Sequence, residues 1–184
     1  QPPPSCRPPS LDNTRNTLNL LLPRAVLEPR TTTADRAVPD GMIQSGYVPI
    51  RRFPFRVGRE SRGETVDGRF LGRLRQRSAD QKPNNDLYLM DPGPGLQVSR
   101  EHFQIEERDG GFVLVDRGST LGTMVGDVRL GRGSGVTSAP LADGDLVRIG
   151  DSRSPYVYRF ICDLVPRACR PRRSRWRMAR RALP

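Results

Sequence analysis

Short stretches in which apolar and polar residues alternate run through the middle of the chain. Phe103 and Ile105, for example, alternate with Gln104 and Glu106. This period of two is typical of a β-strand that buries one face. The same pattern predicts strands over 47–51, 53–57, 86–90, 112–116, 123–125, 128–130, 146–149 and 156–162. Turn residues separate these stretches and no helical period stands out, so the chain is predicted to be all-β, a two-sheet β-sandwich.

Two of the turns predict tight hairpins. An Asp-Gly pair lies between 103–107 and 112–116, and a Gly-Asp pair lies between 123–125 and 128–130. Such pairs favour the backbone conformations of short β-turns. Residues 112–115 are apolar on both faces, which indicates a strand in the interior of its sheet. The glycine- and serine-rich stretch 131–140 is predicted to be a loop.

Composition divides the chain into three parts. Residues 1–45 are Pro-rich and lack periodicity, which predicts a flexible, disordered leader. The alternative is that its apolar patch forms one short helix or docks on the domain. Residues 46–164 hold the predicted strands and form the expected folded domain. Within it, the polar insertion 60–84 predicts either disorder or a helical turn over 70–77. Its arginines either flank a pocket or are simply solvated.

The positive charge of the protein is concentrated at one end. The 184 residues have a formal net charge of +11, and the last twenty hold eight arginines and no acidic residue. A basic tail over 165–184 can attract nucleic acid or an anionic membrane surface. It can equally be a disordered, solubilising segment. The domain itself is close to neutral, so the basic character describes the tail.

Cysteine usage and hydropathy bear on the compartment. Cys6, Cys162 and Cys169 form no C-x-x-C pair and are too few for a disulfide framework. A reducing cytoplasm is therefore expected. No apolar run reaches the eighteen or so residues that a transmembrane helix needs, so no transmembrane segment is expected.

Three predicted turns at strand ends carry side chains that can bind an oxyanion. Arg59 follows the strand over 53–57, Ser99 and Arg100 precede the strand over 103–107, and Thr120 follows the strand over 112–116. Arginine offers a planar fork of donors, and small hydroxyl groups add donors without bulk. If these turns meet in space, they form an oxyanion pocket.

The motifs in these turns resemble those of the forkhead-associated (FHA) domain family, over about residues 46–164. The motifs are, in chain order, Gly58-Arg59, Ser99-Arg100-Glu101-His102, Gly118-Ser119-Thr120-Leu121-Gly122-Thr123 and Asp143-Gly144-Asp145. The resemblance implies a β-sandwich that binds phosphothreonine peptides in signalling or assembly. It places Arg59, Ser99 and Thr120 on the phosphate and Arg100 on the phosphate or the peptide. The excess of arginine over lysine suggests a bacterial source.

The resemblance also implies a set of residues that support the loops without touching the ligand: Gly58, His102, Ser119, Gly122 and Thr123. His102 is the only histidine, and no second histidine or suitably spaced cysteine completes a metal site. No nucleophile elbow accompanies Ser99, so a Ser–His catalytic pair is not indicated. The chain is therefore expected to be a binding module, not an enzyme, with no metal, cofactor or small-molecule substrate.

Leu121 departs from the family pattern, which has asparagine at this position. The resemblance implies that this asparagine holds the peptide backbone beside the phosphothreonine, and leucine has no donor or acceptor for that role. Leu121 could offer an apolar contact to the peptide in its place. Two hypotheses follow: a phosphothreonine-binding module, or an interaction and scaffold module that acts independently of phosphate. Nucleic-acid association through the tail is a third.

Overall fold

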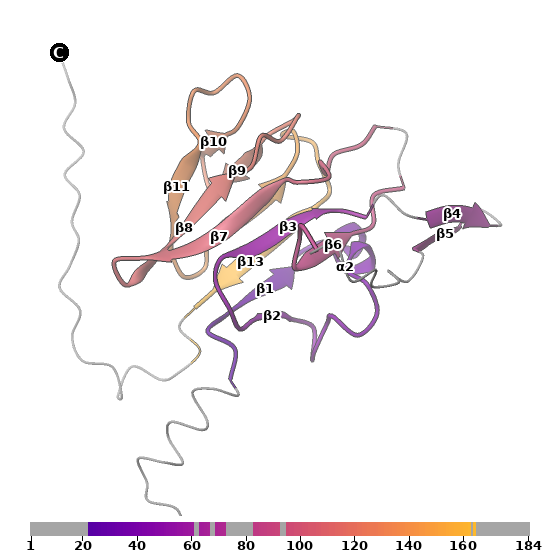
Figure 1. The fold of residues 1–184 in the computed structure, drawn as a ribbon, viewed down its shortest axis with the longest axis horizontal. Helices are drawn as coiled ribbons and strands as arrows, with labels where there is room; N and C mark the ends of the chain where they lie inside the picture. The colour runs from indigo at the N-terminus through magenta and orange to yellow at the C-terminus, as the bar shows by residue number, and fades with distance from the viewer. Residues whose placement is uncertain are drawn as a thin grey trace, which may run out of the picture.

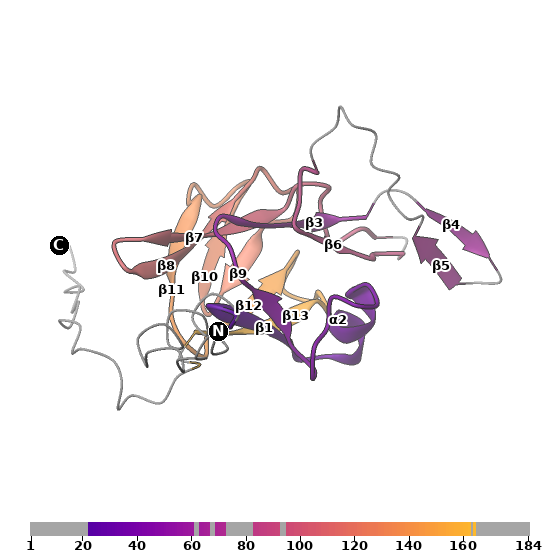
Figure 2. The same cartoon turned by 60° about the horizontal axis from the view of Figure 1, so that its bottom comes forward.

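The computed structural model describes residues 22–60, 63–66, 69–72, 83–92, 95–162 and 164. Two large sheets face each other, as Figures 1 and 2 show, and a third sheet is a two-stranded pair within the insertion 60–84. The six-stranded sheet has the order β10 (Val128–Leu130), β9 (Thr123–Val125), β12 (Leu146–Ile149), β13 (Val157–Ile161), β1 (Ala25–Pro29) and β2 (Val48–Ile50). The five-stranded sheet has the order β11 (Ser138–Leu141), β8 (Gly111–Asp116), β7 (Phe103–Arg108), β3 (Phe55–Arg59) and β6 (Leu87–Leu89). The predicted two-sheet β-sandwich is confirmed.

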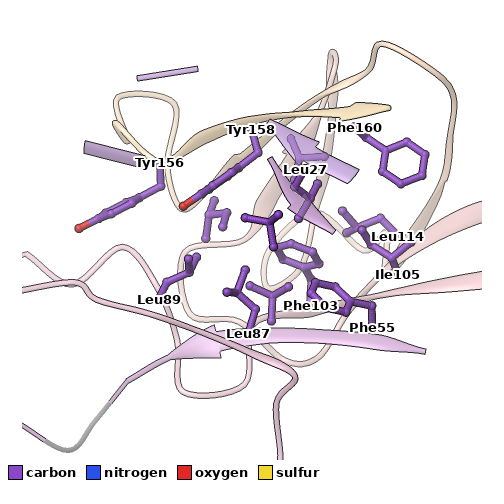
Figure 3. Packing of buried hydrophobic residues seen from close by; sticks show 14 of the residues in the cluster. Leu27, Phe55, Leu87, Leu89, Phe103, Ile105, Leu114, Tyr156, Tyr158 and Phe160 are labelled. Carbon is purple, nitrogen blue, oxygen red and sulfur yellow. The ribbon is translucent and has the colours of Figure 1, made fainter. Parts of the chain in front are cut away.

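The core lies between the two sheets. Leu27, Tyr158 and Phe160 point inward from the six-stranded sheet and meet Phe103 and Leu114 of the five-stranded sheet (Figure 3). Each of these side chains is at most 1% exposed. Burying a large apolar side chain contributes about 1.5–3 kcal/mol. The alternation of residues along each strand therefore sets the register of the sandwich, because a shift by one residue would turn the apolar set outward.

The folded domain begins before residue 46, which corrects the predicted boundary of the leader. β1 lies between β13 and β2, with Leu27 opposite Phe160 on one side and Val48 on the other. Three of its five residues, Ala25–Leu27, are buried. The sequence of this segment is typical of a linker, because only three apolar residues lie between Pro23 and Pro29. Its pairing with β13, more than a hundred residues away, supplies the stabilisation that local sequence lacks. Residues 1–21 lie outside the described residues.

A single turn of helix, α2 (Thr32–Ala37), covers one end of the core. The Thr31 hydroxyl accepts a hydrogen bond from the Ala34 amide at 3.0 Å, which is a standard helix N-cap. Tyr158 reaches from the core and donates its hydroxyl proton to the Ala34 carbonyl oxygen at 3.0 Å. Burial raises the pKa of the Tyr158 phenol, so this donor keeps its proton. No helix among the described residues is long and apolar enough to span a membrane.

Two further predictions need correction. In the insertion 60–84, Gly63–Val66 (β4) and Arg69–Gly72 (β5) form an antiparallel pair, so residues 70–72 are strand and not helix. The rest of the predicted helical turn, 73–77, lies outside the described residues. The predicted loop 131–140 contains the start of β11, whose Ala139 pairs with Leu114. Its proline, Pro140, fits because β11 is an edge strand.

Both predicted hairpins are present. Residues Asp109 and Gly110, between β7 and β8, have φ angles of 49° and 76°. A two-residue turn with both φ angles positive matches the twist of the strands that it joins. The second hairpin joins β9 to β10, with Val125 opposite Val128.

The register of the five-stranded sheet brings the three candidate loops to one edge. Val57 of β3 lies opposite Phe103 of β7, and Phe103 lies opposite Asp116 of β8. Arg59 is two residues beyond Val57, Ser99 is four residues before Phe103, and Thr120 is four residues after Asp116. All three residues therefore leave the sheet at the same end.

Replacement of Leu27 by alanine tests whether β1 is an integral part of the sandwich. Because Leu27 is fully buried, we expect Leu27→Ala to lower the free energy of unfolding by about 2–5 kcal/mol. Val128→Ala is the control, since Val128 is 46% exposed and should change stability by no more than about 0.5 kcal/mol. Urea unfolding measures both. Equal midpoints for Leu27→Ala and the unmodified protein would contradict the placement of β1.

Candidate functional site

Arg59 at the end of β3 is held by the loop that precedes β7. Its backbone amide donates to the Ser99 carbonyl oxygen at 2.9 Å. Its side-chain Nε donates to the Val98 carbonyl oxygen at 3.0 Å. The guanidinium group is half-buried, and no carboxylate in the described part of the chain forms an ion pair with it. The two terminal nitrogens therefore remain as donors for an anion.

Ser99 and Thr120 lie side by side. The Thr120 amide donates to the Ser99 Oγ at 2.9 Å, and the two hydroxyl oxygens are 3.3 Å apart. These contacts join loops that are 21 residues apart in the sequence. Because the Arg59 amide also bonds to Ser99, the structure brings the loops of three predicted phosphate-binding residues together.

His102 connects the same two loops from beneath. Its imidazole is fully buried, and its Nδ1 accepts a hydrogen bond from the Ser99 amide at 2.8 Å. Its Nε2 lies 2.9 Å from the Gly122 carbonyl oxygen. Because Nδ1 accepts, the proton must be on Nε2, which then donates to Gly122. Burial lowers the pKa of His102, and this favours the neutral ring that the two bonds require.

Gly58 lets the loop before β7, which is the second of the three candidate loops, lie directly on β3. A Cβ atom at this position would come within 2.1 Å of the Arg100 carbonyl oxygen. It would also lie 2.6 Å from the side-chain nitrogen of Asn85. Only glycine fits beneath this crossing.

The loop between β8 and β9, which is the third candidate loop, is fixed by Asp116 and by a glycine. Asp116 Oδ1 accepts hydrogen bonds from the amides of Gly118 and Ser119, both at 2.9 Å, and the buried Ser119 hydroxyl donates to Oδ2. Gly122 has a φ of +79°, and a Cβ atom there would meet the Leu130 carbonyl oxygen at 2.4 Å. Thr123 is fully buried, and its hydroxyl has no hydrogen-bond partner among the described residues.

Arg100 and Leu121 border this cluster. The Arg100 side chain is exposed, while its carbonyl oxygen accepts a hydrogen bond from Asn85 Nδ2 at 2.8 Å. Leu121 is half-buried, and its carbonyl oxygen accepts a hydrogen bond from Arg129 at 3.1 Å. Arg100 is therefore open to solvent, and Leu121 is a partly exposed apolar residue that follows Thr120 in the chain.

The structure adds a supporting network that the sequence did not reveal. Arg117 donates to Asn85 Oδ1 at 2.6 Å and forms an ion pair with Glu101 at 3.3 Å. The Arg117 amide donates to the His102 carbonyl oxygen at 2.9 Å. These bonds hold the second loop against the start of the third loop. Asn85 lies in a polar stretch before β6, where sequence alone indicates only a turn.

A buried carboxylate anchors the start of the second loop. Asp91 Oδ2 accepts hydrogen bonds from the amides of Gln97 and Val98 at 2.7 and 2.8 Å. Its Oδ1 accepts from the Tyr156 hydroxyl at 2.8 Å. Burial and the neighbouring Asp91 raise the pKa of Tyr156, so the phenol stays a donor. Asp91 thereby positions Val98, whose carbonyl oxygen orients Arg59.

Comparison with known proteins identifies the class to which this fold and cluster belong. The model of the FHA domain family matches residues 56–150, and the chain belongs to this family. FHA domains are binding modules for phosphothreonine peptides.

Two bacterial proteins are similar to the chain in sequence. The oxoglutarate dehydrogenase inhibitor of Corynebacterium diphtheriae is 36% identical over 96 residues, which are 52% of this chain and 60% of that protein. The glycogen accumulation regulator GarA of Mycolicibacterium smegmatis is 38% identical over 96 residues, or 52% of this chain and 54% of that protein. The chain thus matches little more than half the length of each relative.

Solved structures are also similar in part. The structure of Mycobacterium tuberculosis EmbR in complex with a low-affinity phosphopeptide has 20% sequence identity to this chain and a TM-score of 0.44. The match covers 82% of this chain and 29% of the EmbR chain. The FHA domain of the Chlamydia trachomatis protein CT664 has 14% identity and a TM-score of 0.45, with 75% and 96% covered.

Gly58→Ala tests the crossing of the second loop over β3. We expect a loss of about 1–3 kcal/mol in the free energy of unfolding, because the added methyl group forces the Arg100 carbonyl away. Gly111→Ala is the matched control, since a Cβ atom there meets its nearest neighbour at an ordinary 3.7 Å. Urea unfolding of both variants measures the difference. A Gly58→Ala protein as stable as Gly111→Ala would rule out the close approach.

The protonation of His102 can be measured directly, because it is the only histidine in the chain. We expect its imidazole to titrate below pH 6.5 in NMR spectra, since burial lowers its pKa. The folded state then binds fewer protons than the unfolded state, so stability falls as the pH drops below about 6.5 toward the folded pKa. A pKa at or above 6.5 would show that the ring is not held neutral.

Proposed function

We propose that Arg59, Ser99 and Thr120 bind the phosphate of a phosphothreonine-containing protein. Phosphothreonine carries about −1.5 to −2 charges and three acceptor oxygens. Arginine pairs with such a group through parallel, charge-assisted hydrogen bonds, and the two hydroxyl groups supply additional donors. The chain would act through this pocket as an interaction module in signalling or assembly.

The single observation that carries this proposal is the meeting of the three loops. Arg59 is oriented by Val98, Ser99 contacts Thr120, and each contact crosses between segments that are far apart in the sequence. The protein's own groups make these connections between the loops. A pocket that is organised in advance loses little conformational entropy when the phosphate binds.

The other predicted residues take roles that follow from their positions. Arg100 is exposed beside Ser99 and would contact the phosphate or the peptide. Gly58, His102, Ser119, Gly122 and Thr123 would hold the loops without touching the ligand. Leu121 would contact the peptide through its apolar side chain.

Leu121 also favours a second candidate function, binding that does not depend on phosphate. Since the leucine side chain has no donor or acceptor for a peptide backbone, the affinity for a phosphopeptide then rests on the phosphate alone or is lost. In that case the same face would bind an unmodified partner through apolar contacts. The experiment below separates the two functions.

The named relatives suggest a setting for the module. Their names describe one as an inhibitor of oxoglutarate dehydrogenase and the other as a regulator of glycogen accumulation. By analogy, a phosphothreonine-dependent switch in bacterial metabolism or signalling, acting in the cytoplasm, is the role that we propose for this chain. The Arg-rich tail, for which nucleic-acid or membrane-surface binding was a hypothesis, lies outside the described residues.

Titration with matched peptides tests the proposed function. We expect a phosphothreonine peptide to bind more tightly than its unphosphorylated twin, and Arg59→Ala to weaken that binding by about tenfold or more. Arg52→Ala is the control, because it removes an equal charge from an exposed position before the opposite end of β3. Fluorescence anisotropy reports both. Equal affinity for the two peptides, unchanged in Arg59→Ala, would favour the phosphate-independent function.

A further inference from the structure

Arg129 lies beside the phosphate-binding cluster, on the edge strand β10. Its Nη2 donates to the Leu121 carbonyl oxygen at 3.1 Å. Leu121 is the residue directly after Thr120, so this bond places a guanidinium group next to the third loop. Because β10 ends the six-stranded sheet, its outer edge pairs with no further strand among the described residues.

The charge of Arg129 is not neutralised by the described part of the protein. Arginines at 24, 30, 108, 117 and 159 each form an ion pair with a glutamate. Arg129 is exposed and has no such partner among the described residues. Its bond to Leu121 uses one of five N–H groups, which leaves most of the donors for a ligand.

Leu121 and Arg129 together form a two-part surface, which we call the third-loop flank. Leu121 provides an apolar side chain that cannot hydrogen-bond. Arg129 provides an anchored cation whose preferred partner is a carboxylate, through paired N–H···O bonds. The hydrogen bond to the Leu121 carbonyl limits the motion of the guanidinium, so less side-chain entropy is lost on binding.

We propose that Arg129 binds a carboxylate side chain of the phosphothreonine ligand, so that the module selects an aspartate or glutamate close to the phosphothreonine. This inference rests on the function proposed above. The phosphate fixes the ligand at Ser99 and Thr120, and a peptide that crosses the third loop then passes Leu121 and reaches Arg129. The selectivity for a ligand carboxylate thereby comes from Arg129 on β10 and not from Leu121 in the loop.

Peptides with one variable position test the inference. One phosphothreonine peptide is the parent of the series. Each variant has aspartate, or its neutral isostere asparagine, at one of the three positions before or the three positions after the phosphothreonine. For the unmodified protein at low salt, we expect aspartate to be preferred about fivefold at one or more positions. Arg129→Ala should remove this preference, and Arg52→Ala should keep it. Because the pair is exposed, added salt should weaken the preference.

A charge reversal makes the test more specific. In Arg129→Glu, lysine at the selected position should bind better than aspartate. Phosphate discrimination without any aspartate preference would overturn this inference alone, and so would a preference that persists in Arg129→Ala. If the unmodified protein bound the phosphorylated and unphosphorylated peptides equally, the proposed function itself would be overturned.

Discussion

The candidate site depends on one neutral imidazole. His102 accepts a hydrogen bond from Ser99 and donates one to Gly122, and it is fully buried while it does so. A protonated ring could not accept from the Ser99 amide, and a buried charge without a partner carries a large desolvation cost. The ring thus ties the second loop to the third loop only in its uncharged form. The hydroxyl groups of Ser99 and Thr120 meet above this link.

The remaining supports act on the same two loops from other directions. Asp91 fixes the residues before Ser99, the ion pair of Arg117 and Glu101 fixes those after it, and Asp116 fixes the turn before Thr120. All of them connect to strands of the sandwich, whose register already places the loops at one edge. Rigid strands and these hydrogen bonds therefore hold the donors of the candidate site in place.

Local patterns predicted much of this structure. Alternating residues around Phe103 and the Asp-Gly turn predicted β7 and β8. Three short motifs pointed to Arg59, Ser99 and Thr120, whose loops do meet, while their binding of phosphate stays a prediction. β1 was missed because a three-residue apolar run between two prolines becomes a strand only through β13. Asp91 and Arg117 were missed for a related reason. Their partners at Tyr156 and Asn85 are 65 and 32 residues away, and a polar residue with a distant partner leaves no period in the sequence.

The central claim is that the loops joined by His102 place Arg59, Ser99 and Thr120 around one phosphate. A crystal structure of the complex with a phosphothreonine peptide tests this most directly. We predict a phosphate oxygen within hydrogen-bond distance of the Arg59 guanidinium and others at the hydroxyl groups of Ser99 and Thr120, with both hydrogen bonds of His102 kept. A phosphate bound elsewhere, or a His102 released from Ser99 and Gly122 in the complex, would contradict it.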